Sequence, residues 1–327
     1  MRVANKLDYL NDEDKSKQLK LTFPLTWCFG VYNTCEFSEF NDYLLSLSIY
    51  DIDKPKAVIQ IAHGMEEHKE RYDEFCLFLN KNGFAVVIAD MRGHGKNAPL
   101  LGFFHEKEGY KRLIQDQLEI RKYISKLYDV PCYLFAHSMG TIISRVFLQE
   151  YSSYYDKVVL CGYPNYQKMA PFGLPIAKLI SIFKGKKSKS KMLKNLSTGS
   201  FNKQIDNPES ESSWISYNKE NVHSFDEDPL CGFGFTSSAY FDLVKLVCLM
   251  HKEKRYHNVN ENLKMLLIRG EDDPCVGGKN GEEDSYNTLI KAGFRNIERI
   301  NYPHMRHEIL NEENHQVVFD DVVKFYN

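Results

Sequence analysis

The sequence has no long apolar run and no closely paired cysteines. No stretch reaches the ~18 apolar residues that a transmembrane helix requires, and the cysteines form no C-x-x-C pair. Several of the eight cysteines fall inside segments that read as strands or helices, where a reduced cysteine acts as a small hydrophobic residue. Neither disulfide bonds nor a structural zinc site is therefore expected.

Excess charge and an apolar leader are also missing. The formal net charge is −2 and 43% of the residues are hydrophobic, which is typical of a globular protein and not of a disordered or nucleic-acid-binding one. The N-terminal residues MRVANKLDYLNDEDKSK carry charges where a signal peptide would need an apolar stretch. We therefore expect a cytoplasmic protein with no nucleic-acid partner.

Apolar runs of strand length alternate with helical patterns along most of the chain. Residues 57–62 (AVIQIA) and 84–89 (FAVVIA) predict strands buried on both faces, and a helical pattern over 72–82 separates them. An antiparallel first strand is predicted at 43–50. Further strands are predicted at 133–135, 157–160, 263–268 and 297–302, and further helices at 109–128, 282–292 and 314–325. This alternation predicts an α/β fold with a mostly parallel sheet covered by helices on both faces.

The alternation breaks at Gly162. From there to about residue 238 no comparable strand pattern appears, and Pro, Lys, Ser and Asn become frequent. We interpret residues 164–238 as an inserted, mainly helical cap, and we assign the α/β core to residues 1–163 and 239–327.

A serine lies at a predicted strand-to-helix turn. Residues 136–140 read AHSMG, which matches the G-x-S-x-G nucleophile elbow except that Ala136 replaces the first glycine. Crowding by neighbouring strands demands only a small residue at that position, and alanine meets this demand. Ser138 is therefore a candidate nucleophile. The alternative is a buried serine that caps the following helix.

A nucleophilic serine needs a histidine base, and the base needs an orienting carboxylate. Two later strand patterns are followed by such residues: EDD at 271–273 and PHMRH at 303–307. Parallel strands bring these ends to the same edge of the sheet as Ser138. The chain order Ser138, Asp273, His307 is that of the α/β-hydrolase triad.

Two residues compete for these roles. Asp272 could replace Asp273, and His304 could replace His307. Each aspartate alone could be a turn former, and each histidine alone could be a surface residue. We favour Asp273 and His307, because three suitable residues then follow three successive strands in the expected order.

A serine nucleophile also needs two N–H donors for the oxyanion that forms on the attacked carbonyl. The backbone N–H of Met139, directly after the nucleophile, is the first candidate. The loop His63-Gly64-Met65 follows an earlier strand, and its glycine lets the backbone approach the substrate. We assign the second donor to Met65. His63 is interpreted as a support for this loop, with a role as catalytic base as the alternative.

Motifs for cofactors and metals are missing. Residues 92–95 (RGHG) lack the lysine and the spacing of a phosphate-binding loop, so we interpret them as loop architecture. No helical H-E-x-x-H occurs, and His304 and His307 have no convincing partner ligands in the sequence. No cofactor and no metal are expected.

Five stretches together resemble the monoacylglycerol lipase and lysophospholipase branch of the α/β-hydrolases, including bacterial members grouped with serine aminopeptidase-like hydrolases. They are HGMEEHKERYDEF from His63, DMRGHG from Asp90, FAHSMG from Phe135, RGEDDP from Arg269 and PHMRHEILNE from Pro303. The stretch DPLCGFGFT from Asp228 also resembles bacterial members. The resemblance spans about residues 45 to 326. It implies the α/β-hydrolase fold, with a mostly parallel eight-stranded sheet and an inserted cap.

The same resemblance implies a carboxylic ester hydrolase acting on single acyl chains, such as those of monoacylglycerols or lysophospholipids. It implies catalytic roles for Ser138, Asp273 and His307 and oxyanion roles for Met65 and Met139. The alternative is an aminopeptidase-like amide hydrolase with the same triad. Such an enzyme would hold a substrate amine with acidic cap residues, for which Glu209, Glu211, Asp226, Glu227 and Asp228 are candidates. A catalytically inactive binding protein is the more distant alternative.

The cap contains a strongly apolar segment at 170–183 (APFGLPIAKLISIF), followed by a run of lysines. Ile176, Leu179, Ile180 and Phe183 fall at helical spacing, and we expect them to line the path of an acyl chain. The lysines could contact anionic lipid, so transient contact with a membrane surface is possible. The alternative is a helix packed on the core beside a solvated lysine loop.

Overall fold

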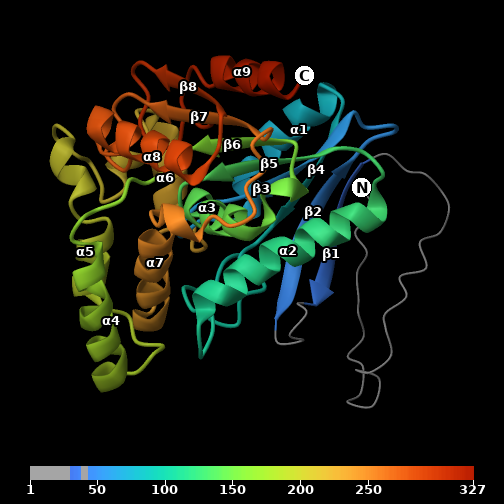
Figure 1. Ribbon diagram of the computed structural model, residues 1–327. Coiled ribbons are helices and arrows are strands. Elements are labelled where there is room, and N and C mark those ends of the chain that lie inside the picture. Colours follow the sequence, from blue (N-terminus) through green and yellow to red (C-terminus); the bar gives the residue numbers. More distant parts are fainter. Residues whose placement is uncertain (1–29, 38–42) are drawn as a thin grey trace, which may run out of the picture.

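An eight-stranded sheet forms the centre of the molecule. The computed structural model describes residues 30–37 and 43–327 (Figure 1). The strand order is β1-β2-β4-β3-β5-β6-β7-β8. The bounds are β1 Gly30–Phe37, β2 Leu44–Asp51, β3 Ala57–Ala62, β4 Phe84–Ala89, β5 Cys132–His137, β6 Lys157–Cys161, β7 Lys264–Gly270 and β8 Asn296–Tyr302. The pairs β1–β2 and β2–β4 are antiparallel and the remaining pairs are parallel.

Helices cover both faces of this sheet because its central strands are apolar on both sides. In β3, Val58 packs into one hydrophobic cluster and its neighbour Ile59 into the other, as the alternation of side chains along a strand requires. Helices α1 (Asp73–Lys81) and α9 (Gln316–Tyr326) cover one face. The other face is covered by α2 (Gly109–Leu127), α3 (Met139–Tyr151), α7 (Ser237–Met250) and α8 (Gly278–Ala292).

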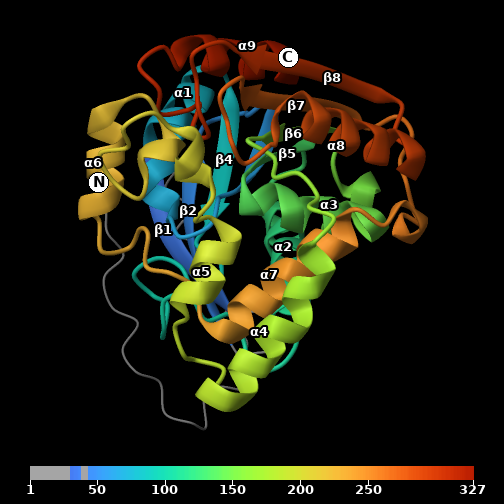
Figure 2. The ribbon, with the colours of Figure 1, turned by 90° about the vertical axis from the view of Figure 1, so that its left-hand side faces the viewer.

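Between β6 and α7 the chain leaves the sheet and forms helices without strands. These are α4 (Ala170–Lys184), α5 (Lys191–Ser197) and α6 (Lys219–Glu227), joined by short 3-10 turns. Figure 2 shows α4 lying along α7, and Ala177 of α4 is fully buried. The predicted division into a core and a cap at residues 164–238 stays a prediction. Helix α7, which spans that boundary, contacts both α4 and the core helices α2 and α3.

Two further expectations concern membrane-spanning helices and the signal peptide. Within the described ranges, no helix combines the length and apolarity needed to cross a bilayer. The N-terminal residues on which the signal-peptide prediction depends lie outside the described residues.

Candidate active site

Ser138 occupies a sharp turn between β5 and α3. Its backbone has φ 50° and ψ −118°, a conformation that non-glycine residues rarely adopt and that is typical of nucleophile elbows. The turn is possible because Gly140 follows: a Cβ there would lie 2.2 Å from the carbonyl oxygen of Ala62. Ala136 is completely buried within β5. The side chain of Ser138 makes no capping hydrogen bond to α3, so the helix-cap alternative is not supported.

The structure brings Ser138, His307 and Asp273 into one chain of contacts. His307 Nε2 lies 2.8 Å from Ser138 Oγ, and His307 Nδ1 lies 2.9 Å from Asp273 Oδ2. All three residues are buried. Asp273 is itself fixed, because its Oδ1 accepts the N–H of Cys275 at 2.8 Å. This geometry allows His307 to remove the serine proton while Asp273 holds the ring in place.

The competing residues lie outside this chain of contacts. Asp272 is exposed and accepts a hydrogen bond from the hydroxyl of Tyr217 at 3.0 Å. His304 is also exposed and has a positive φ of 53°.

The loop with the predicted second oxyanion donor runs directly against Ser138. A Cβ placed on Gly64 would lie 3.1 Å from the Cβ of Ser138, so the backbone before Met65 passes close to the nucleophile. Met139 is the first residue of α3, and N–H groups in the first turn of a helix have no intrahelical acceptor. Both predicted donors therefore lie beside Ser138. Their oxyanion roles stay predictions.

Two buried histidines support this loop as hydrogen-bond acceptors. His63 Nε2 accepts the N–H of Met91 at 2.9 Å, and its Nδ1 lies 2.8 Å from the carbonyl oxygen of Gly64. His94 Nε2 accepts the N–H of Glu66 at 3.2 Å. Burial lowers the pKa of His63, and burial together with His63 lowers that of His94 to about 3. Each Nε2 accepts an N–H and so carries no proton, and the contacts of His63 give it a supporting role.

The segment after α6 is fixed to the same loop by an ion pair. His68 Nε2 lies 2.8 Å from Asp228 Oδ2, and its Nδ1 lies 2.6 Å from Glu70 Oε2. Burial would lower the pKa of His68, but hydrogen bonds to Cys231, Glu70 and Asp228 outweigh it and raise the pKa to about 10. His68 is thus a cation between two carboxylates. The N–H of Gly232 also bonds to the carbonyl of Glu66 at 3.0 Å.

Two residue sets among the described residues have donor atoms close enough to hold a metal ion. One consists of His68, Asp228 and Cys231, and the other of Asp273, Cys275 and His307. In the first set both ring nitrogens of His68 already contact carboxylates. In the second set His307 and Asp273 contact each other. The expectation of no metal stays a prediction.

An aromatic residue from the segment between β6 and α7 packs against the histidine of the site. The ring of Trp214 lies 4.9 Å from that of His307, centroid to centroid. The backbone beside it is anchored, because the N–H of Glu308 bonds to the carbonyl of Ile215 at 2.7 Å and Arg306 bonds to the carbonyl of Ser213 at 2.7 Å. Sequence reasoning missed Trp214. A lone aromatic residue in a segment without periodicity does not indicate which residue its ring contacts.

The predicted acyl-chain residues lie on α4 and differ in burial. Ile180 is half-buried and packs against the main core cluster. Leu179 and Phe183 are 54% and 82% exposed, and Ile176 is 37% exposed. An open acyl groove and a lipid-facing surface both expose such side chains. Their part in substrate binding stays a prediction.

The acidic residues proposed to hold a substrate amine are mostly paired. Asp228 contacts His68, Glu209 contacts Lys219 at 2.5 Å and Glu211 contacts Lys194 at 2.9 Å. Asp226 and Glu227 are exposed on the last turn of α6. The structure therefore does not bring the five carboxylates together as one amine-binding cluster.

The chain is similar in sequence and structure to known hydrolases. The family model described as serine aminopeptidase, S33, matches residues 53–314. Mouse monoglyceride lipase is 29% identical over 230 residues, which cover 69% of this chain and 68% of that protein. Lysophospholipase L2 of Escherichia coli K12 is 28% identical over 142 residues, covering 42% of this chain and 41% of that protein. The structure of a carboxyl esterase from Bacillus coagulans, in complex with glycerol, superposes with a TM-score of 0.84 at 26% identity, covering 92% of this chain and 99% of that one.

Proposed function

Because this chain belongs to the serine aminopeptidase S33 family, we propose that it is a serine hydrolase that cleaves carboxylic esters of single acyl chains through an acyl-enzyme on Ser138. The observation that carries the proposal is the chain of contacts from Ser138 Oγ through His307 to Asp273. The substrates are of the monoacylglycerol or lysophospholipid type. Relatives named for these two activities support this choice.

The reaction has two steps. His307 takes the proton of Ser138, the serine oxygen attacks the ester carbonyl, and the alcohol leaves after receiving the proton from His307. Water then attacks the carbonyl of the acyl-enzyme while His307 takes its proton. The fatty acid leaves, and His307 returns the proton to the oxygen of Ser138. Asp273 holds the His307 tautomer and stabilises the imidazolium without taking the proton itself. The N–H groups of Met65 and Met139 stabilise the oxyanion, and no cofactor takes part.

Amide cleavage at an amino terminus is the alternative within the family. It requires a carboxylate free to hold the substrate amine, whereas Asp228, Glu209 and Glu211 are paired with cations. This pairing argues against an amine-binding role for these three residues, whereas Asp226 and Glu227 are exposed at the end of α6. A cytoplasmic location belongs to the same proposal.

A substrate panel tests this function. Monoacylglycerols, lysophospholipids, p-nitrophenyl esters and aminoacyl arylamides would be compared on the wild type and on Ser138→Ala, with Ser144→Ala, on the helix that follows Ser138, as a matched control. The account predicts ester turnover that Ser138→Ala abolishes and Ser144→Ala retains. Turnover confined to the arylamides would overturn the ester assignment.

We also propose that the outer face of the cap touches lipid surfaces during substrate uptake. This face consists of Met169, Phe172, Leu179, Ile182 and Phe183, whose side chains are 54% to 82% exposed. Lys184 directly follows Phe183 and is exposed. Large apolar side chains next to cations suit the surface of an anionic bilayer.

Sedimentation with phosphatidylglycerol-containing vesicles tests this contact. The double substitution Leu179→Ser with Phe183→Ser should reduce the bound fraction, and turnover of soluble p-nitrophenyl acetate should be unchanged. Leu77→Ser is the control, because Leu77 is 45% exposed on α1, away from the cap. Equal binding by all variants would rule out this face as the contact.

A further inference from the structure

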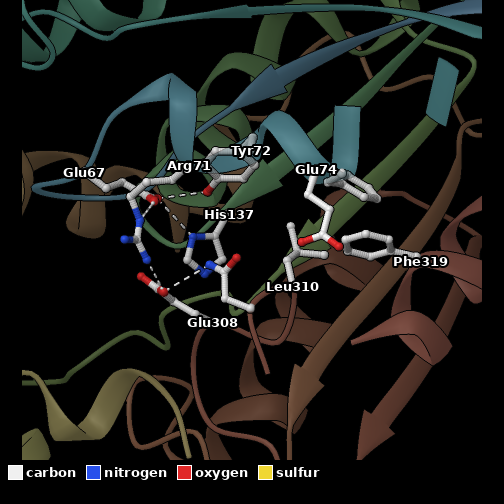
Figure 3. A pocket seen from close by; sticks show the side chains of 10 residues that line it. Glu67, Arg71, Tyr72, Glu74, His137, Glu308, Leu310 and Phe319 are labelled. Carbon is white, nitrogen blue, oxygen red and sulfur yellow. Dashed lines mark hydrogen bonds and ion pairs between the residues drawn. The ribbon is translucent and has the colours of Figure 1, made fainter. Parts of the chain in front are cut away.

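A cavity behind the nucleophile gathers charged side chains on the α1 and α9 side of the sheet (Figure 3). Glu67, Arg71, His137 and Glu308 lie together at one end of it, and Glu74 lies at the other. The first four are almost completely buried, whereas Glu74 has a side chain that is 75% exposed. The catalytic steps proposed above use none of these five residues.

The environment of His137 defines its protonation. Its Nδ1 lies 3.3 Å from Glu67 Oε1, and its Nε2 lies 3.3 Å from the backbone carbonyl oxygen of His307. A carboxylate and a carbonyl can only accept, so each ring nitrogen must carry a hydrogen to bond to its partner. Both contacts are hydrogen bonds at the same time only when the ring is an imidazolium. Burial lowers the pKa of His137, but the hydrogen bond and charge of Glu67 and the charge of Glu308 outweigh burial and raise it.

Glu67 joins His137 to the oxyanion loop. Its Oε1 accepts the N–H of Gly64 and the hydroxyl of Tyr72, the latter at 2.9 Å, and its Oε2 lies 3.5 Å from Arg71 Nε. Gly64 directly precedes Met65, whose N–H is the proposed donor. A carboxylate is required here because every neighbour of Glu67 is a donor or a cation. Glu67 thus holds the N–H side of the Gly64 peptide, and His63 contacts the carbonyl oxygen of Gly64.

Arg71 and Glu308 extend the contacts to the catalytic histidine and the cap. Arg71 Nη2 lies 2.5 Å from Glu308 Oε2, and Glu308 directly follows His307 in the chain. The amide of Asn221 on α6 donates to the same Oε2 at 2.8 Å. The four charges balance, with two carboxylates facing two cations. Removing one member of such a buried set is costly, because it leaves an uncompensated buried charge.

We propose that Glu67 and His137 are positioning residues. They fix three parts of the catalytic site relative to one another: the nucleophile turn, the backbone of His307 and the loop of the second oxyanion donor. Through its two ring nitrogens, the His137 cation ties the nucleophile turn to Glu67 and to the backbone of His307. Through Glu67 it ties that turn to the loop of the second oxyanion donor. The inference rests on the proposed nucleophilic role of Ser138 and adds to it the residues that set its geometry.

Glu67→Gln tests the proposal kinetically, with Glu74→Gln as the matched control at the exposed end of the same cavity. We expect kcat for p-nitrophenyl acetate to fall roughly 10- to 100-fold, less than the ~100- to 1000-fold loss of an oxyanion donor itself. KM should change little, because the substrate pocket is untouched. Glu74→Gln should match the wild type. An active wild type with an equally active Glu67→Gln would overturn the positioning role, whereas an inactive wild type would overturn the proposed function.

A second measurement needs no change at Glu67. In histidine-labelled wild-type protein, a nitrogen NMR titration should show both ring nitrogens of His137 protonated up to a pH above the ordinary histidine pKa of ~6.5, with the signal assigned by its loss in His137→Gln. The groups facing His137 are Glu67, Arg71 and Tyr72 after β3, Cys161 at the end of β6, and His307 and Glu308 after β8. A neutral ring for His137 would overturn the proposal.

Discussion

At the scale of single residues, burial and contacts decide between candidates that look alike in the sequence. The sequence predicts a carboxylate after β7 and a histidine after β8, because strand ends in a parallel sheet meet at one edge. It offers two neighbouring residues for the acid and two for the base. Only the structure shows that Asp273 and His307 point inward and that Asp272 and His304 face solvent. The supporting roles of Glu67 and His137 could not be predicted, since they arise from contacts between segments 70 residues apart.

Substitution of the two aspartates tests this distinction. Asp273→Asn should lower kcat by about 10⁴-fold, because an amide stabilises the wrong tautomer of the base. Asp272→Asn should retain nearly full activity, since its carboxylate bonds only to the exposed Tyr217 hydroxyl. Steady-state hydrolysis of p-nitrophenyl acetate measures both. The reverse order of damage would transfer the acid role to Asp272.

At the scale of elements, the sequence predicted strands that are buried on both faces of the sheet, but it did not predict a helix that packs against several neighbours. β3 and β4 were predicted because strands buried on both faces are apolar throughout. α7 was not predicted. It lies between α4 on one side and α2 and α3 on the other, and a helix with apolar neighbours on several sides does not show a clean amphipathic period.

Helix α4 offers a test of the acyl-chain prediction. Ile180 is half-buried against the core, whereas its neighbour Leu179 is 54% exposed. Ile180→Trp should therefore shift the preference of the enzyme toward short acyl esters, and Leu179→Trp should do so less. Turnover of p-nitrophenyl acetate should stay nearly constant in both, because the triad is untouched. Unchanged chain-length profiles in both variants would remove α4 from the acyl site.

The contact between α7 and the start of α2 predicts a pH-dependent stability. Burial raises the pKa of Asp242 to about 7, although the backbone N–H groups of Tyr110 and Gly109 partly oppose this. An unfolded aspartate has a pKa of ~3.9, so the folded state holds this proton more tightly. The stabilising contribution of Asp242 is therefore complete below pH ~4 and is lost as the pH rises through about 7.

Asp242→Asn removes this dependence, because an amide does not titrate. The free energy of unfolding of the variant minus that of the wild type should increase between pH ~4 and about 7 and then level off. Urea unfolding at several pH values measures it. A difference that stays constant, or that falls with rising pH, would show that Asp242 is ionised throughout this range.

At the scale of the whole molecule, the resemblance seen in the sequence is confirmed by the family match over residues 53–314. The α/β-hydrolase fold is also confirmed, and the similarity to the Bacillus coagulans carboxyl esterase extends over 92% of the chain. The course of the segment between β6 and α7 could not be predicted from the sequence. Trp214 and Asn221 reach the catalytic loop through contacts with residues about 90 positions away.

Chelation tests whether the complete enzyme depends on a metal. Dialysis against EDTA should leave ester hydrolysis unchanged, because the proposed reaction uses only side chains and backbone N–H groups. The measurement is the rate before dialysis, after dialysis, and after addition of zinc. Loss of activity that zinc restores would point to the His68, Asp228 and Cys231 set or to the triad set as a metal site.

Covalent labelling of the nucleophile tests the central claim most directly. The wild type would be titrated with a fluorophosphonate, the residual ester hydrolysis measured at each step, and the modified residue identified by peptide mass spectrometry. The account predicts a single adduct on Ser138 and a loss of activity in proportion to labelling. An adduct on another residue, or full activity after complete labelling of Ser138, would contradict it.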